Sequence, residues 1–140
     1  MADKNIYTVI VADDEDELRE AVCTMIPWEA LGFHLVGSAS NGLDALELVE
    51  RLEPDLLLTD IRMPFMSGIE LARQVREVRP ATQIAFLSGY DDFAYAQQAI
   101  QYNIISYLLK PISMADLTAE LLEIRKKLDH LFEELQAKQK

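Results

Sequence analysis

Four apolar runs in this chain are each followed by polar residues that can do phosphoryl chemistry. Asp13 and Asp14 follow the first run, and Asp60, Ser88 and Lys110 follow three later ones. Carboxylates that gather at one site repel one another unless a cation joins them, and a hard divalent ion such as Mg²⁺ prefers such oxygen ligands. A lysine ammonium and a serine hydroxyl supply a positive charge and a donor for phosphoryl oxygens. These residues therefore predict a site for Mg²⁺ and a phosphoryl group.

The pattern of apolar residues predicts the elements that bring these side chains together. Short apolar, β-branched runs predict five strands, at residues 6–12, 33–39, 55–59, 83–87 and 105–109. Helical spacing of apolar residues predicts five helices, beginning near residues 15, 41, 69, 93 and 113. Strands that alternate with helices imply a parallel sheet covered on both faces. Parallel strands share one carboxyl edge, so the polar residues meet there if the second strand lies outermost beside the first.

The composition indicates one compact domain. The chain has 140 residues, half of them hydrophobic, which suits a single domain with a sizeable core. Its net charge of −11 argues against direct contact with nucleic acid, because phosphate neutralisation needs Lys and Arg. The single cysteine excludes an internal disulfide, and no signal peptide or membrane-spanning run is apparent. We therefore expect a cytoplasmic protein without membrane contact, in which any DNA binding belongs to another domain.

The polar residues, in their order along the chain, resemble the receiver domain of two-component response regulators. The matching positions are Asp13, Asp14, Asp60, Met63, Pro64, Gly68, Ser88, Tyr107, Lys110 and Pro111. The resemblance implies a receiver domain over residues 1–125 with an α/β, flavodoxin-like, doubly wound fold. This fold has five parallel strands in the order 2-1-3-4-5, with five helices and, in this chain, an extended C-terminal helix.

The resemblance also implies how the site would work. Asp60 would accept a phosphoryl group from the phosphohistidine of a sensor histidine kinase. Asp14 and Asp60 would ligate Mg²⁺ directly and Asp13 through water, and the backbone carbonyl of Arg62 would complete the protein ligands. The protein would then be a phosphorylation-activated switch, not an enzyme acting on other molecules, because it would catalyse only its own phosphorylation and dephosphorylation.

A second group of residues would respond to the phosphoryl group, again by resemblance. Lys110 would pair with it, while Ser88 would move inward and Tyr107 would turn from exposed to buried. These movements would change the surface made by the fourth helix, the fifth strand and the fifth helix. Two of the remaining positions would be structural: Gly68, and Pro111, which would follow a cis peptide. Arg62 and Tyr90 would tune the lifetime of the phosphoryl group.

Two further segments indicate a subgroup of this family. Residues 88–96 and the tripeptide Pro27-Trp28-Glu29 resemble members that carry an AraC-type DNA-binding domain at the C-terminus. The expected partners are therefore a sensor histidine kinase and, in the full-length protein, a DNA-binding output domain that controls transcription.

The predicted C-terminal helix carries a leucine-rich stripe that continues past residue 125. Its spacing alternates between four and three residues, as in the seam of a two-helix coiled coil. The stripe consists of Leu117, Leu121, Ile124, Leu128, Leu131 and Leu135. We expect residues 126–140 to be a helical extension, either a linker to an output domain or a coiled coil that forms a homodimer. The alternative is that the first three residues dock on the sheet and the rest frays.

Two other interpretations of the site remain open on the residues alone. Asp13 to Asp16 could serve only to stabilise the start of a helix, where acidic side chains complement the helix dipole. A small-molecule phosphatase that forms an aspartyl phosphate would place similar groups, but such enzymes usually carry a second acid two residues beyond the nucleophile. Arg62 occupies that position and no cap domain is apparent, so we favour the switch.

Overall fold

The computed structural model describes residues 6–89, 94, 97 and 100–138. Its strands are β1 (Tyr7–Ala12), β2 (Phe33–Ala39), β3 (Leu56–Thr59), β4 (Gln83–Gly89) and β5 (Ser106–Lys110). Its helices are α1 (Asp16–Met25), α2 (Trp28–Leu31), α3 (Gly42–Leu52), α4 (Gly68–Val78) and α6 (Met114–Lys138), with a 3-10 turn, η2 (Ile100–Tyr102). The strands form one parallel sheet in the order β2-β1-β3-β4-β5, so the predicted flavodoxin-like fold is confirmed. Most of the helix predicted at residues 93–100 lies outside the described residues.

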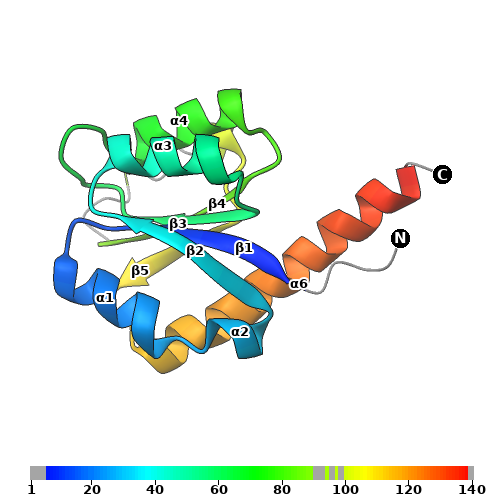
Figure 1. Cartoon of the computed structure of the whole chain (residues 1–140), viewed down its shortest axis with the longest axis horizontal. Coiled ribbons are helices and arrows are strands. Elements are labelled where there is room, and N and C mark those ends of the chain that lie inside the picture. The colour runs from blue at the N-terminus through cyan, green and yellow to red at the C-terminus, as the bar shows by residue number, and fades with distance from the viewer. Residues whose placement is uncertain (1–5, 90–93, 95–96, 98–99, 139–140) are drawn as a thin grey trace.

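Helices cover both faces of the sheet (Figure 1). Helices α3 and α4 pack on one face, and α1, α2 and α6 pack on the other. Successive residues of a strand point to opposite faces, which divides the core into two clusters. Val9, Val11 and Leu58 belong to the cluster under α1, α2 and α6, whereas Ile10 and Leu57 belong to the one under α3 and α4. All of β3 is buried, as expected of a strand covered on both faces.

The helices begin and end for local reasons that the sequence shows. The side chain of Asn41 caps α3, and that of Ser67 caps α4, by accepting a hydrogen bond from the backbone three residues on, at 2.9 and 3.2 Å. Pro27 follows the end of α1, as predicted. A four-residue helix that the sequence did not predict, α2, then begins and is closed by Gly32 at a φ of 90°.

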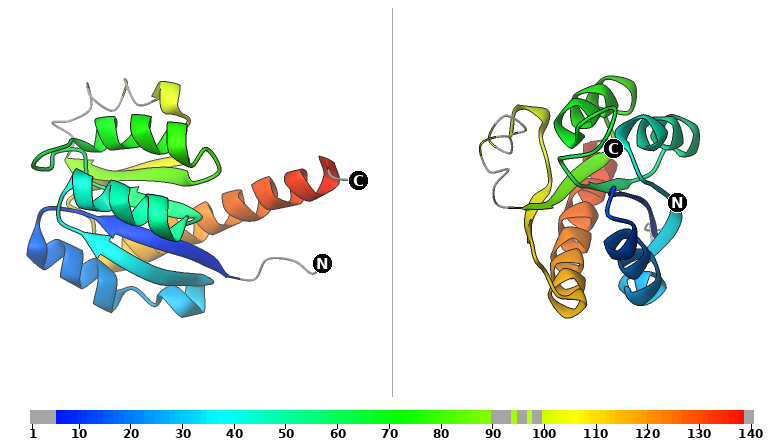
Figure 2. Two further views of the ribbon diagram at one scale, coloured as in Figure 1. Left: turned by 45° about the horizontal axis from the view of Figure 1, so that its top comes forward. Right: turned by 90° about the vertical axis from the view of Figure 1, so that its left-hand side faces the viewer.

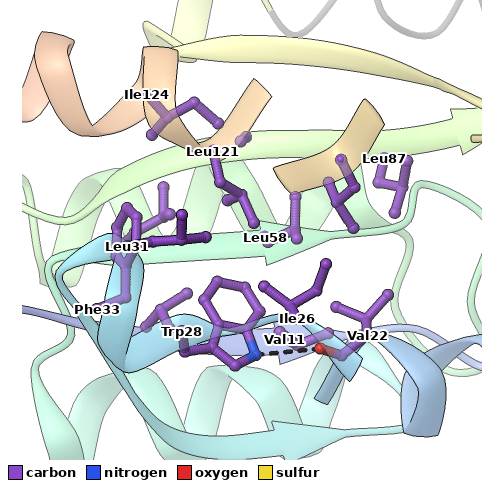
Figure 3. Packing of buried hydrophobic residues seen from close by; sticks show 14 of the residues in the cluster. Val11, Val22, Ile26, Trp28, Leu31, Phe33, Leu58, Leu87, Leu121 and Ile124 are labelled. Carbon is purple, nitrogen blue, oxygen red and sulfur yellow. Dashed lines mark hydrogen bonds between the residues drawn. The ribbon is translucent and has the colours of Figure 1, made fainter. Parts of the chain in front are cut away.

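Helix α2 contributes an aromatic anchor to the core (Figure 3). Trp28 is buried, and its ring lies edge-on to Phe33 with 5.9 Å between the centroids. Its indole N–H donates to the backbone carbonyl of Val22 at 3.1 Å. An indole that is buried with its donor satisfied stabilises the packing around it. Helix α2 therefore ties the end of α1 to the start of β2.

Helix α6 is longer than the sheet that it covers. It starts after β5 and runs to the edge opposite to the carboxyl ends of the strands, where its last turns leave the body of the protein (Figure 2). Of its apolar stripe, the buried members are Leu117, Leu121, Ile124 and Leu128. Leu131 and Leu135 are 37% and 57% exposed. No helix in the described part of the chain is both long and apolar enough to cross a membrane.

A polar cluster holds α6 against the starts of β1 and β2. The hydroxyl of Tyr7 donates to Asp129 Oδ1 at 2.6 Å, and Arg125 Nε donates to the same oxygen at 3.1 Å. The Arg125 guanidinium also donates to the Leu31 carbonyl at 3.1 Å and lies 5.0 Å from the centroid of the Tyr7 ring. The docked part of α6 therefore extends to Asp129, one turn beyond the Ile124 of the alternative considered above.

Candidate functional site

The ends of β1, β3 and β5 bring three charged side chains to one point. Asp13 follows β1, Asp60 follows β3, and Lys110 is the last residue of β5. Lys110 Nζ lies 2.9 Å from Asp13 Oδ2 and 3.2 Å from Asp60 Oδ2. The structure therefore brings these predicted residues together at the carboxyl edge of the sheet.

Backbone N–H groups fix the two aspartates that flank Lys110. Asp13 Oδ1 accepts from the backbone N–H of Glu15 at 2.9 Å, and Asp60 Oδ1 accepts from that of Ile61 at 2.7 Å. Both aspartates are buried, at 3% and 6% exposed. One oxygen of each carboxylate is thus held by the backbone while the second faces the lysine.

Glu15 belongs to the site, although nothing in the sequence marked it separately as a site residue. Its carboxylate contacts Lys110 Nζ. Asp13, Glu15 and Asp60 each offer one carboxylate oxygen, and these oxygens lie within 4.8 Å of one another. Such a set fits a hard divalent ion. The only signal in the sequence was that Glu15 follows the acidic pair, and an acidic residue at a helix start is common without such a role.

Asp14 lies on the exposed side of this cluster. It lines a hollow of about 800 Å³ whose wall also includes Ile61, Arg62, Met63, Pro64, Ser67, Ile69 and Glu70. Partial burial, and after it the negative charge of Asp60, raise the pKa of Asp14. The predicted ligand set of Asp13, Asp14, Asp60 and the Arg62 carbonyl stays a prediction.

Burial and charge act against each other in this site. Burial raises the pKa of Asp13 to about 6, although the backbone N–H of Glu15 and the ammonium of Lys110 act in the opposite direction. Burial lowers the pKa of Lys110, but hydrogen bonds to Glu15 and Asp13 outweigh it and the net pKa lies above its usual value. The ammonium therefore stays charged, and a bound cation would relieve the repulsion that remains among the carboxylates.

The two predicted switch residues lie on neighbouring strands beside the site. Ser88 is fully buried near the end of β4, where it pairs with Leu109 of β5. Tyr107 is half-buried, its hydroxyl oxygen is buried, and its ring lies edge-on to Phe86 at 6.4 Å between centroids. The Tyr107 ring packs against the side of the sheet covered by α3 and α4, and its predicted turn from exposed to buried stays a prediction.

The remaining predicted positions shape the loops around the site. A Cβ at Gly68 would lie 2.0 Å from the backbone carbonyl oxygen of Asp60, so only glycine fits where α4 begins. The peptide bond between Lys110 and Pro111 is cis, as the resemblance implies. Arg62 is exposed at the rim, and Tyr90 lies outside the described residues.

The chain is similar in sequence to known signalling proteins. It matches the response regulator receiver domain family over residues 9–122. It is 37% identical over 140 residues to YesN of Bacillus subtilis, an uncharacterized transcriptional regulatory protein, covering 93% of this chain and 38% of that protein. It is 37% identical over 112 residues to the transcriptional regulatory protein HptR of Staphylococcus aureus, covering 80% of this chain and 44% of that protein. The chain thus spans less than half the length of these relatives.

The fold is similar to that of solved receiver structures. The receiver domain of AraT, a response regulator from Geobacillus stearothermophilus, superimposes with a TM-score of 0.77 at 35% identity, covering 96% of this chain and 99% of that one. The two-component transcriptional regulator AraC from Clostridium phytofermentans superimposes with a TM-score of 0.78 at 33% identity, covering 87% of this chain and 95% of that one. From the sequence match and the strand order together, we conclude that this chain belongs to the response regulator receiver domain family.

Proposed function

We propose that the chain is a phosphorylation-activated switch in which Asp60 accepts a phosphoryl group from a sensor histidine kinase. The observation that carries this proposal is the placement of Lys110 Nζ between the carboxylates of Asp13 and Asp60. An ammonium at this point can pair with phosphoryl oxygens, and phosphoryl transfer depends mostly on such positioning and charge neutralisation. Family membership supports the same function.

The residues around Asp60 suggest how the transfer proceeds. Its Oδ1 accepts from the backbone, so we assign Oδ2, which faces Lys110, as the oxygen that forms the new P–O bond while the P–N bond of the donor breaks. Asp13, Asp14, Asp60 and the Arg62 carbonyl would hold Mg²⁺. When bound, this ion would neutralise the carboxylates and the phosphoryl oxygens.

The response to phosphorylation would begin at Ser88. A phosphoryl oxygen on Asp60 offers this buried hydroxyl a charge-assisted hydrogen bond that the free carboxylate does not offer at that place. Tyr107, on the next strand, would move with it and alter the surface that includes β5. Arg62 and Tyr90 would set how easily water reaches the phosphoryl group, and so its lifetime.

The output we propose is transcription. The relatives are transcriptional regulators more than twice as long as the matched region, which supports a C-terminal DNA-binding domain in a longer protein. The similarity to the two-component transcriptional regulator AraC of Clostridium phytofermentans supports an AraC-type domain. The charge of −11 gives no reason for this chain itself to contact DNA. The cytoplasmic location and the homodimer stay predictions.

Treatment with phosphoramidate and Mg²⁺ tests the switch against the phosphatase alternative. A switch takes up one phosphoryl group per chain and loses it slowly, whereas a phosphatase releases phosphate continuously over many turnovers. We expect stoichiometric labelling followed by slow decay. Sustained release of phosphate at a constant rate would favour the phosphatase.

A further inference from the structure

All three donors of the Lys110 ammonium have a carboxylate in reach. A lysine ammonium carries three N–H groups. Lys110 Nζ lies 2.9 Å from Asp13 Oδ2 and 3.2 Å from Asp60 Oδ2, and it contacts the carboxylate of Glu15 as well. Phosphorylation of Asp60 Oδ2 replaces that contact by one with the phosphoryl group, so the ammonium can donate to a second phosphoryl oxygen only if Asp13 or Glu15 releases it.

Glu15 is the partner that is released at least cost. The side chains of Asp13 and Asp60 are only 5% and 8% exposed, and each has an oxygen fixed by the backbone. The side chain of Glu15 is 58% exposed, so water can solvate its carboxylate as soon as the contact breaks. Ion pairs with such an exposed partner contribute little to stability.

We propose that Glu15 is a positioning residue that holds Lys110 in the unphosphorylated protein and competes with the phosphoryl group for it. This inference rests on the proposed phosphorylation of Asp60. Glu15 then acts through the lysine and not as a ligand of Mg²⁺. Its carboxylate weakens the hold of the site on a phosphoryl group, because it occupies the donor of Lys110 that a second phosphoryl oxygen would take.

The side chain of Glu15 has no structural task that would confuse the test. Glu15 is the N-cap residue of α1, but its side chain makes no capping hydrogen bond. Replacing the carboxylate by an amide of the same shape keeps the volume and removes the charge. Glu15→Gln should therefore fold as the parent does.

Asp16 provides a matched control for the change in charge. It is the next residue, its side chain is 80% exposed, and it pairs with Arg19 at 2.8 Å. Asp16→Asn removes one negative charge at the start of the same helix without touching Lys110. An effect of net charge alone would appear in both variants, whereas an effect of the lysine contact appears only in Glu15→Gln.

The test uses beryllofluoride, a stand-in for the phosphoryl group, and calorimetry on the full chain. In the presence of Mg²⁺, we expect Glu15→Gln to bind beryllofluoride about two- to five-fold more tightly than the parent, the range of an exposed ion pair. Asp16→Asn should stay close to the parent. The affinity for Mg²⁺ alone should change no more in Glu15→Gln than in Asp16→Asn.

Two results would overturn the role given to Glu15. Equal affinity of Glu15→Gln and the parent for beryllofluoride would show that the glutamate does not compete for Lys110. A loss of Mg²⁺ affinity of about tenfold or more, confined to Glu15→Gln, would identify Glu15 as a ligand of the ion instead. If the parent itself binds no beryllofluoride, the proposed function fails, and the role of Glu15 fails with it.

Discussion

Asp13 is buried, unlike a free carboxyl group in water, and this predicts that the free energy of unfolding depends on pH. Its pKa is raised from 3.8 to about 6, mainly by burial. In the metal-free protein, the folded state therefore binds more protons than the unfolded state between these two values. The free energy of unfolding should accordingly fall as the pH rises through this window, and level off above it.

Asp13→Asn should remove the loss of stability that comes from ionising this buried carboxyl group. Without Mg²⁺ at pH 7, we expect the variant to be more stable than the parent by on the order of 2 kcal/mol, with a flatter dependence of unfolding free energy on pH. Urea unfolding in chelator at pH 5 and pH 7 measures both. Asp16→Asn, at the exposed start of α1, should behave as the parent. An Asp13→Asn variant less stable than the parent at pH 7 would contradict the burial argument.

Gly68 is the structural residue whose substitution should cost most. Helix propensity alone favours alanine by about 1 kcal/mol. A Cβ at this position would meet the Asp60 carbonyl oxygen at 2.0 Å, so the start of α4 must shift, and we expect Gly68→Ala to lower the free energy of unfolding by about 1–3 kcal/mol. Urea denaturation measures the change. Gly89→Ala is the control, because its Cβ would meet no atom of the described residues within 4 Å. Equal effects of both variants would refute the argument.

Ser88 should couple the phosphoryl group to Tyr107 without being needed for phosphorylation. Ser88→Ala should still be labelled to the same extent, because it removes only the hydroxyl that responds to the new oxygens. The change in the NMR signals of the Tyr107 ring on addition of beryllofluoride should be lost. Ser106→Ala, at the first residue of β5, should keep this change in the Tyr107 signals. If beryllofluoride changes the Tyr107 signals of Ser88→Ala as much as those of the parent, the coupling takes another route.

At the scale of elements, most of the sheet follows from local patterns. The apolar run of β3 and the helix that Asn41 caps stand where predicted. The cap at Ser67 was not predicted, because this serine was expected to belong to the loop before α4. Helix α2 was missed because four residues are too short to show a helical period. The end of β4 was missed too: Ser88 lies within the strand, because its pairing with β5 continues past Leu87.

The candidate site was predictable only in part. Asp13, Asp60 and Lys110 could be placed because parallel strands share a carboxyl edge. The contact between Glu15 and Lys110 joins residues 95 positions apart, and only the sheet, which places the loop after β1 and the end of β5 at the same edge, brings them together. Nothing in the local pattern around Glu15 separates a partner of lysine from an acidic residue at a helix start.

The coiled-coil prediction for α6 now concerns fewer residues. Leu128 is 4% exposed and belongs to the core of the domain, so only Leu131 and Leu135 remain for a partner. Fewer than two heptads make a weak dimer. We expect sedimentation to show weak self-association of the beryllofluoride-bound chain that is lost in the double variant Leu131→Asp, Leu135→Asp.

Leu122→Asp is the control for this experiment. Leu122 lies on the same helix, is 44% exposed and is not part of the stripe, so its variant should self-associate as the parent does. A parent that stays monomeric at every concentration would contradict the prediction, as would a double variant that associates equally well.

At the scale of the whole molecule, the candidate site and the C-terminal end of α6 lie at opposite edges of the sheet. The candidate site is at the carboxyl edge, and α6 begins there, four residues after Lys110. The helix then crosses the sheet and leaves at the other edge, where the contacts of Arg125 and Asp129 hold it (Figures 1 and 2). In the longer protein proposed above, a change at the site would reach the following domain through one continuous helix docked along the sheet.

The central claim is that Asp60 accepts the phosphoryl group and needs a divalent ion to do so. Mass spectrometry of the protein after treatment with acetyl phosphate tests it most directly. With Mg²⁺, we predict one phosphoryl group per chain, located on Asp60, and none in the presence of a chelator or in Asp60→Asn. Full labelling of Asp60→Asn, or labelling of the parent that a chelator does not reduce, would contradict the account.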